Sequence, residues 1–72
     1  MKSNVININT KIKKALELLQ KSKIKTLAVI NKDKKLLGTI TDGDIRRGLL
    51  KNINISDNIQ KVYNKNPNFI YI

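Results

Sequence analysis

The segment from Gly38 to Arg47 constrains the fold of this chain most, because it holds the end of one element and the start of the next. Branched apolar residues lead into Thr41-Asp42-Gly43-Asp44, and a basic stretch follows. This spacing matches a capping box, in which a threonine hydroxyl accepts a hydrogen bond from the amide three residues later and the acidic side chain there accepts one from the threonine amide. We therefore predict a strand that passes into a helix at this point.

The same residues also have the chemistry needed to bind a nucleotide. The Thr41 hydroxyl and the Asp44 carboxylate can bond to the vicinal hydroxyls of a ribose, while nearby amides and arginines suit phosphate. Capping alone accounts for both side chains, so the two interpretations stay open here. Gly43 favours the second, since glycine in a first helical turn costs up to about 1 kcal/mol relative to alanine and adds nothing to capping. We interpret it as a place of close backbone approach.

The flanking segments predict the remaining elements. Residues 5–8 alternate weakly and indicate a short strand, and apolar residues recur at helical spacing over residues 11–22. Residues 26–30 and 36–40 are branched, apolar runs that we expect to pair as an antiparallel hairpin. The first of these is apolar on both faces, which favours a central position covered on one side by helices. The pattern predicts an α/β (α+β) fold with a small three-stranded sheet and two helices.

Later segments are shorter and less regular. Ile45, Leu49 and Leu50 give the second helix an apolar side. Ser56 is expected to cap a turn of helix over residues 57–62, with Ile59 and Val62 facing inward. Residues 64–68 are rich in asparagine and contain a proline, so they are expected to end the preceding helical turn. Residues 69–72 form a predicted strand that invites pairing with another surface. Gly38, inside a strand, indicates either a bulge or the close approach of a backbone or ligand.

Composition bounds the function. Seventy-two residues make one small, marginally stable domain, and the absence of cysteine and histidine excludes disulfides, common zinc sites and histidine catalysis. The net charge of +10 raises the question of nucleic-acid binding, but the dispersed lysines and the separate position of the aromatic residues argue against it. Five acidic residues with no nucleophile and base pair argue against an enzyme. No apolar run approaches a membrane span, so a cytoplasmic protein is expected.

The element order and the junction sequence Gly-Thr-Ile-Thr-Asp-Gly-Asp resemble the CBS domain, a regulatory module named after cystathionine beta-synthase. The resemblance predicts a CBS motif with its connecting helix over residues 1–62, and over residues 63–72 a linker and the first strand of an incomplete second motif. The sequence of residues 37–47 is similar to CBS segments attached to sugar-phosphate nucleotidyltransferases and to arabinose-5-phosphate isomerases. The resemblance implies a catalytic domain in the parent protein, and we expect a nucleotidyltransferase.

The resemblance also implies a binding site for AMP, ADP or ATP. Gly38, Thr41 and Asp44 fall on the adenosine-phosphate motif of the family. Asp44 would hold the ribose hydroxyls, Thr41 would meet the ribose or first phosphate, and Gly38 would permit the approach. Thr26, Leu27 and Ile40 would line the adenine slot by backbone and apolar contact, and Arg47 would face a phosphate. Solvent exposure of Arg47, or an ion pair between Arg47 and Asp44, is the alternative.

Three functions follow as hypotheses. The first is a nucleotide-sensing regulatory module, with no required cofactor, in which two copies form a homodimer that completes the cleft. The second is a pure association module whose capping box is only structural. The third is a basic nucleic-acid-binding domain, which requires affinity that falls steeply with salt.

Overall fold

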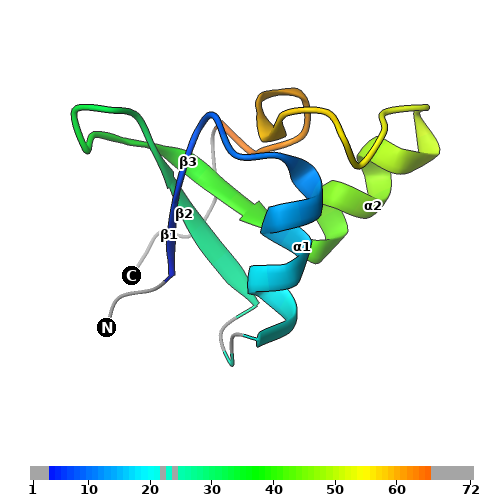
Figure 1. Cartoon of the computed structure of the whole chain (residues 1–72), viewed down its shortest axis with the longest axis horizontal. Helices are drawn as coiled ribbons and strands as arrows, with labels where there is room; N and C mark the ends of the chain where they lie inside the picture. The colour runs from blue at the N-terminus through cyan, green and yellow to red at the C-terminus, as the bar shows by residue number, and fades with distance from the viewer. Residues whose placement is uncertain (1–3, 22, 24, 66–72) are drawn as a thin grey trace.

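Three short strands form one mixed sheet in the order β1-β2-β3 (Figure 1). The computed structural model describes residues 4–21, 23 and 25–65. Strand β1 (Val5–Asn7) pairs in parallel with β2 (Thr26–Ile30), and β2 pairs antiparallel with β3 (Leu36–Thr41). The hairpin and the central position of β2 are thus confirmed.

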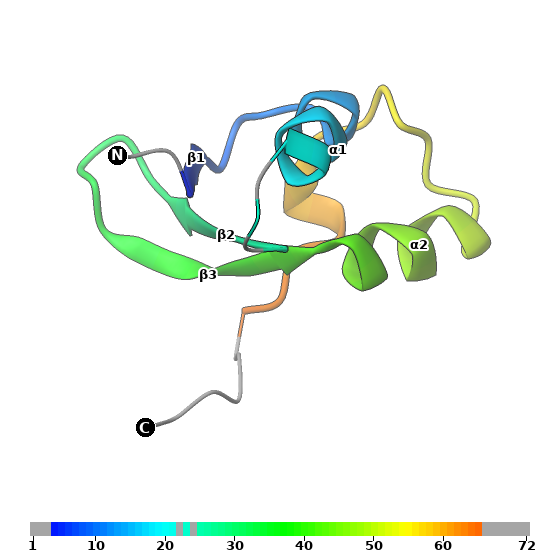
Figure 2. The same cartoon turned by 90° about the horizontal axis from the view of Figure 1, so that it is seen from below.

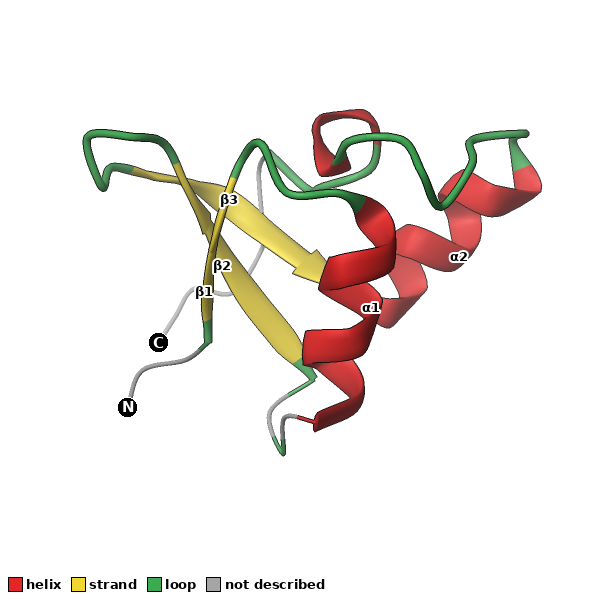
Figure 3. Ribbon diagram, in the orientation of Figure 1, coloured by secondary structure: helices red, strands yellow, loops and turns green. Residues whose placement is uncertain are grey.

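Two helices and one short turn of 3-10 helix complete the described part of the chain (Figure 3). Helix α1 (Ile12–Lys21) is the crossover that the parallel pair β1 and β2 requires. Helix α2 (Asp42–Leu50) follows β3 without a loop, and η1 (Ile59–Lys61) comes after an irregular segment. Figure 2 shows that α1 covers one face of the sheet, whereas α2 continues past the end of β3. The predicted order of strand, helix, strand, strand and helix is confirmed.

The core lies between α1 and the covered face of the sheet. Leu27 and Val29 of β2 alternate inward and are fully buried, as the period of two in a strand requires. Helices α1, α2 and η1 contribute further apolar side chains, and the buried set is Ile6, Ile12, Ala15, Leu19, Leu27, Val29, Ile40, Ile45 and Ile59. Val5, Ala28 and Thr39 are aligned across the three strands on the opposite face, which is only partly shielded.

The predicted apolar side of α2 is only partly correct. Ile45 is buried, but Leu49 is 40% exposed and Leu50 is 80% exposed. Asp44 and Gly48 occupy the inward positions beside Ile45. The reason is the direction of α2, because its last turn lies beyond the sheet and no described element covers it (Figure 2). The prediction that Leu49 and Leu50 face inward was therefore wrong.

The prediction that Ser56 caps a helical turn was also wrong. Asn58 caps η1 instead, since its side-chain oxygen accepts a hydrogen bond from the Gln60 amide at 2.9 Å. The turn is shorter than expected and starts later. Ile59 is fully buried, as predicted, whereas Val62 is partly buried against the core. The predicted strand over residues 69–72 lies outside the described residues.

The segment before η1 is fastened to the start of α1. The first amides of a helix have no partner within the helix. Here the Ile12 amide donates to the Asp57 carbonyl and the Lys13 amide to the Ile55 carbonyl, both at 2.9 Å. In return, the Ile59 amide donates to the Thr10 carbonyl at 2.9 Å. These bonds fix the path of the chain from α2 back across α1.

Candidate functional site

The capping box predicted at the start of α2 is present. Thr41 has extended backbone angles, and its hydroxyl oxygen accepts a hydrogen bond from the Asp44 amide at 3.1 Å. The Asp44 carboxylate in turn accepts one from the Thr41 amide through Oδ2 at 2.9 Å. Two of the otherwise unpaired amides at the helix start are satisfied in this way. The structural role of both side chains is confirmed.

Asp44 has a second partner. Its other oxygen, Oδ1, contacts Nη2 of Arg47 at 2.5 Å in an ion pair across three residues of α2. The Asp44 side chain is only 9% exposed, while that of Arg47 is 67% exposed. A buried carboxylate needs such a partner, and an ionised carboxylate has about four lone-pair positions, so Oδ1 keeps capacity for a further donor. The alternative that the sequence raised for Arg47, an ion pair with Asp44, is therefore present.

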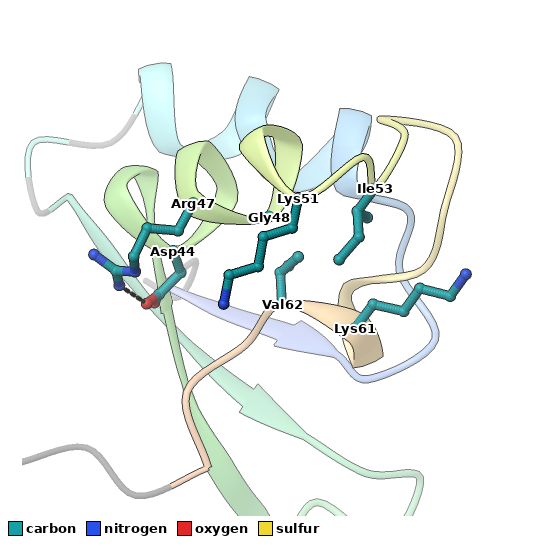
Figure 4. Close-up of a pocket in the computed structure, with 7 residues that line it drawn as sticks. All are labelled: Asp44, Arg47, Gly48, Lys51, Ile53, Lys61 and Val62. Atoms are coloured by element: carbon teal, nitrogen blue, oxygen red, sulfur yellow. Dashed lines mark hydrogen bonds and ion pairs between the residues drawn. The ribbon is translucent and has the colours of Figure 1, made fainter.

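A groove of about 130 Å³ lies beside this ion pair (Figure 4). Helix α2 forms one wall and the segment around η1 forms the other. Its lining combines one acid, three cations and an apolar floor, and consists of Asp44, Arg47, Gly48, Lys51, Ile53, Lys61 and Val62. The Asp44 carboxylate thus accepts a hydrogen bond from the nearby Thr41 amide and at the same time borders the groove.

Gly48 is the residue that brings the two walls together. A Cβ at this position would overlap Cγ1 of Val62, so only glycine lets Val62 pack directly on α2. The sequence analysis predicted Val62 only as an inward-facing residue and assigned no site role to Gly48, Lys51 or Lys61. The available signal was Gly48 itself, because a glycine in a helix interior costs about 1 kcal/mol and this one lies four residues after Asp44, on the same face.

Gly38 permits a close approach, and the group that approaches it is the backbone of Asn64. A Cβ at Gly38 would overlap the carbonyl oxygen of Asn64. Thr39 and Asn64 exchange two backbone hydrogen bonds, of 3.0 Å and 2.8 Å, at the outer edge of β3. The register of the ladder also shifts between Val29 and Ile30, so the strand pairing is irregular next to Gly38. Packing by Tyr63 and Asn64 accounts for Gly38, and its role toward a ligand stays a prediction.

The residues predicted to line an adenine slot lie on opposite faces of the sheet. Leu27 and Ile40 are paired neighbours and fully buried in the core, so in this structure their side chains offer no surface to a ligand. Thr26 and Thr41 are paired in the same ladder, and both are half-buried. Of the predicted set, the structure brings Thr41, Asp44 and Arg47 together at the start of α2 and places Thr26 beside Thr41.

Gly43 is not explained by packing. A Cβ built there would lie 3.6 Å from Nη1 of Arg47 and 3.7 Å from the Thr41 hydroxyl oxygen, both ordinary contacts. Its backbone angle φ is not in the left-handed region. Within the described residues, nothing requires glycine at this position.

A second hollow lies between the end of α1 and the start of α2. It is lined by Leu19, Gln20, Lys25 and Asp42. Lys25 donates to the Leu19 carbonyl at 3.2 Å and so caps the end of α1. Asp42 forms an exposed ion pair with Arg46 at 2.6 Å. The charged groups here already pair with α1 and α2, and such exposed pairs contribute about 0–1 kcal/mol.

The sequence and the fold identify the family. The CBS domain model matches residues 1–51, and the chain belongs to the CBS domain family. CBS domains are generally regulatory, ligand-binding modules and typically not catalytic. Among curated proteins, none matches this sequence. No helix in the described ranges has the length and apolar character needed to cross a lipid bilayer.

Solved structures show the same fold. A CBS-domain containing protein from Agrobacterium tumefaciens has a TM-score of 0.79 and 20% identity, with 86% of this chain and 48% of that chain covered. An uncharacterized conserved protein from Pyrococcus horikoshii has a TM-score of 0.76 and 23% identity, with 92% and 52% covered. A cystathionine beta-synthase domain protein fused to a Zn-ribbon-like domain has a TM-score of 0.75 and 22% identity, with 92% and 96% covered. The chain thus spans about half the length of the first two.

Proposed function

We propose that this CBS module is a regulatory domain that binds an adenosine phosphate or a related nucleotide at the start of α2. The observation that carries the proposal is Asp44, a carboxylate that is almost fully buried and yet borders an open groove rich in cations. Such a group can accept hydrogen bonds from the two hydroxyls of a ribose, while the adjacent cations can hold phosphate. Helix capping alone requires no groove beside the cap.

The roles of the neighbouring residues follow from their positions. The Thr41 hydroxyl lies beside Asp44 and can meet the ribose or the first phosphate. Arg47 is exposed and keeps donors that Asp44 does not use. Gly43, which packing leaves unexplained, gives a ligand room next to the first backbone amides of α2, where the helix dipole favours an anion.

Two copies of the chain complete the site in this proposal. The chain spans about half the length of two of its structural neighbours, and the sheet face that carries Val5, Ala28 and Thr39 is only partly shielded. A homodimer would cover this face and place two grooves in one assembly. The nucleotide would then regulate an attached domain through its different affinity for two arrangements of that assembly.

We extend the proposal to the parent protein on the basis of the junction sequence. The resemblance of residues 37–47 to segments of sugar-phosphate nucleotidyltransferases supports a cytoplasmic enzyme of that class as the regulated partner. The competing function is an association module without a ligand. It is favoured by the capping box, because Thr41 and Asp44 already satisfy each other.

Calorimetry with adenosine, AMP, ADP and ATP separates these functions. Asp44→Asn keeps an acceptor for the Thr41 amide but removes the charge, and we expect it to weaken nucleotide binding about 10-fold or more, as for a lost hydrogen bond to a charged group. The matched control is Asp42→Asn, which removes an exposed charge from the same helical turn. No binding by the parent chain, or equal binding by both variants, would leave the association module as the function.

The homodimer is tested by light scattering coupled to gel filtration. Val5→Lys places a charge on the partly shielded sheet face, and we expect it to shift the chain to monomer. Leu50→Lys is the matched control, because Leu50 is 80% exposed at the far end of α2. A monomeric parent chain, or a dimer that only the Leu50 variant disrupts, contradicts this arrangement.

A further inference from the structure

We propose that the end of helix α2 is a docking surface for a short acidic segment of a partner protein, a segment that presents apolar side chains flanked by carboxylates. The docking surface consists of Leu49, Leu50 and Ile55, with the cations Arg46 and Lys13 at its borders. None of these five residues lines the groove beside Asp44. The inference therefore stands apart from the proposed nucleotide site.

Exposed apolar side chains gather at the end of α2. In the described part of the chain, the large apolar residues that are exposed are Val5, Leu36, Leu49, Leu50 and Ile55. Three of these five lie within residues 49–55, and Leu50, at 80%, is the most exposed of all. Single exposed apolar residues need no explanation, whereas a local group of them marks an interaction site.

The group extends from α2 to the start of α1. Figure 3 shows that the loop after α2 turns back from the end of that helix toward α1. The Ile55 carbonyl accepts a hydrogen bond from the Lys13 amide at 2.9 Å, so Ile55 lies beside the first turn of α1. The docking surface is thus held at both ends by regular structure.

The charges around these apolar residues are positive. The sequence has no acidic residue between Asp44 and Asp57. Arg46 lies one turn before Leu50 on the same face of α2, and its side chain is 72% exposed. Its ion pair with Asp42 is exposed and therefore weak, and a guanidinium has five N–H donors, so Arg46 keeps donors for a further carboxylate.

Lys13 supplies the cation at the other border. Its side chain is exposed, and it takes part in none of the salt bridges of the described residues. Apolar side chains between two cations complement a segment whose apolar side chains lie between carboxylates, because complementary charges fix the register of a partner.

The same charges argue against a second copy of this chain as the occupant. A two-fold contact places the same patch on both sides, so Arg46 and Lys13 would face the cations of the other copy. Such like-charge contacts are costly, and each chain carries a net charge of +10. The uncharged sheet face around Val5, Ala28 and Thr39 suits a homodimer better.

Polar residues within the docking surface argue against a lipid bilayer. A helix that lies on a membrane buries a continuous apolar face by about 5–10 Å. Here the exposed side chains of Asn52 and Asn54 alternate with Ile53 and Ile55. A protein segment can form hydrogen bonds with these amides. Three exposed apolar side chains are also few beside the about 20–30 residues on each side of a stable protein interface, so the surface fits a short segment.

Fluorescence anisotropy tests the docking surface with a labelled synthetic peptide of about 14 residues that carries leucine and glutamate at helical spacing. We expect Leu50→Gln to weaken binding of this peptide about 10-fold, the loss that follows when one leucine is no longer buried at the contact. Leu36→Gln is the matched control, because Leu36 is 61% exposed at the start of β3. It should stay within about twofold of the parent chain. Circular dichroism shows whether both variants fold.

A second pair of variants tests the charges. Arg46→Gln should weaken binding of the same peptide, whereas Lys35→Gln, which removes an exposed cation from the turn between β2 and β3, should not. A peptide with glutamine in place of every glutamate should bind more weakly to the parent chain.

Four results would overturn the inference. The first is no binding of the acidic peptide, and the second is an equal loss in the Leu50 and Leu36 variants. The third is a dimer in light scattering that Leu50→Gln disrupts, which would assign the surface to a second copy. The fourth is binding to phosphatidylglycerol vesicles that depends on Leu50 without binding of the peptide, which would assign it to a lipid surface. Nucleotide binding is unaffected by Leu50→Gln in this inference, so calorimetry with AMP on that variant tests the two sites separately.

Discussion

Val62 packs directly against the Cα of Gly48, in the space that any larger residue at position 48 would need. This contact joins the middle of α2 to the segment after η1, and it forms the floor of the groove beside Asp44. The stability of the fold and the shape of the candidate site therefore depend on the same pair of residues.

Gly48→Ala is expected to destabilise the domain. Alanine gains about 1 kcal/mol in helix propensity, but its methyl group overlaps Val62, and overpacking costs about 1–3 kcal/mol. We expect a net loss of about 1 kcal/mol in the free energy of unfolding measured in urea. The double variant Gly48→Ala with Val62→Ala should recover the part of the loss caused by overlap. If Gly48→Ala alone is more stable than the parent chain, the contact with Val62 is looser than the structure shows.

Gly43→Ala is expected to have opposite effects on stability and binding. Its methyl group meets only ordinary contacts, so the gain in helix propensity should stabilise the domain by about 0.5–1 kcal/mol. The same methyl group would occupy space next to the helix amides and weaken nucleotide binding. Urea unfolding and calorimetry on one preparation check both effects. A variant that is more stable and binds as tightly as the parent chain would show that Gly43 serves no ligand.

Thr41→Ala is expected to destabilise α2 through loss of the cap. The hydroxyl oxygen accepts the Asp44 amide bond, and replacing such a cap by alanine costs about 1 kcal/mol. Thr41→Ser keeps the hydroxyl and should stay within about 0.5 kcal/mol of the parent chain. Thermal unfolding followed by circular dichroism gives both values. Equal melting temperatures for the two variants would contradict the capping role.

Asp57 is expected to make stability depend on pH at the acidic end. Its carboxylate accepts the Asn54 amide at 2.9 Å, and this bond, aided by Lys61, holds the pKa of Asp57 below its usual value of 3.8. Because the folded pKa is lowered, the stabilisation is complete above the unfolded pKa and is lost as pH falls through the folded pKa. An NMR titration of the Asp57 carboxyl carbon and the Asn54 amide measures this. A pKa at or above 3.8 contradicts it, and Asp57→Asn is the control that removes the titration.

Local signals in the sequence predicted the strands, both helices and the capping box. Thr41 and Asp44 interact within one turn, so their pairing needs no knowledge of the rest of the fold. The exposure of Leu49 and Leu50 was not predictable in this way, because it depends on where α2 passes the end of the sheet. The same holds for Gly38 and Gly48, whose packing partners are distant in sequence.

The groove was missed for a related reason. The sequence indicated Asp44 and Arg47 as neighbours on one helix, but Lys61 and Val62 come from a segment whose path is set by contacts with α1. The asparagine that caps η1 and the serine expected to do so are both good capping residues, and only tertiary bonds decide between them.

Three backbone hydrogen bonds join the chain at the start of α1 to the chain leading into η1. Thr10, Ile12 and Lys13 hold that segment at one end, and the bonds between Thr39 and Asn64 hold its continuation at the other. The stretch from residue 55 to residue 64 is therefore held by backbone hydrogen bonds at both ends, and Val62 within it packs on α2. We therefore expect a displacement of α2 that dislodges Val62 to disturb the hydrogen bonds between Asn64 and Thr39 at the edge of the sheet.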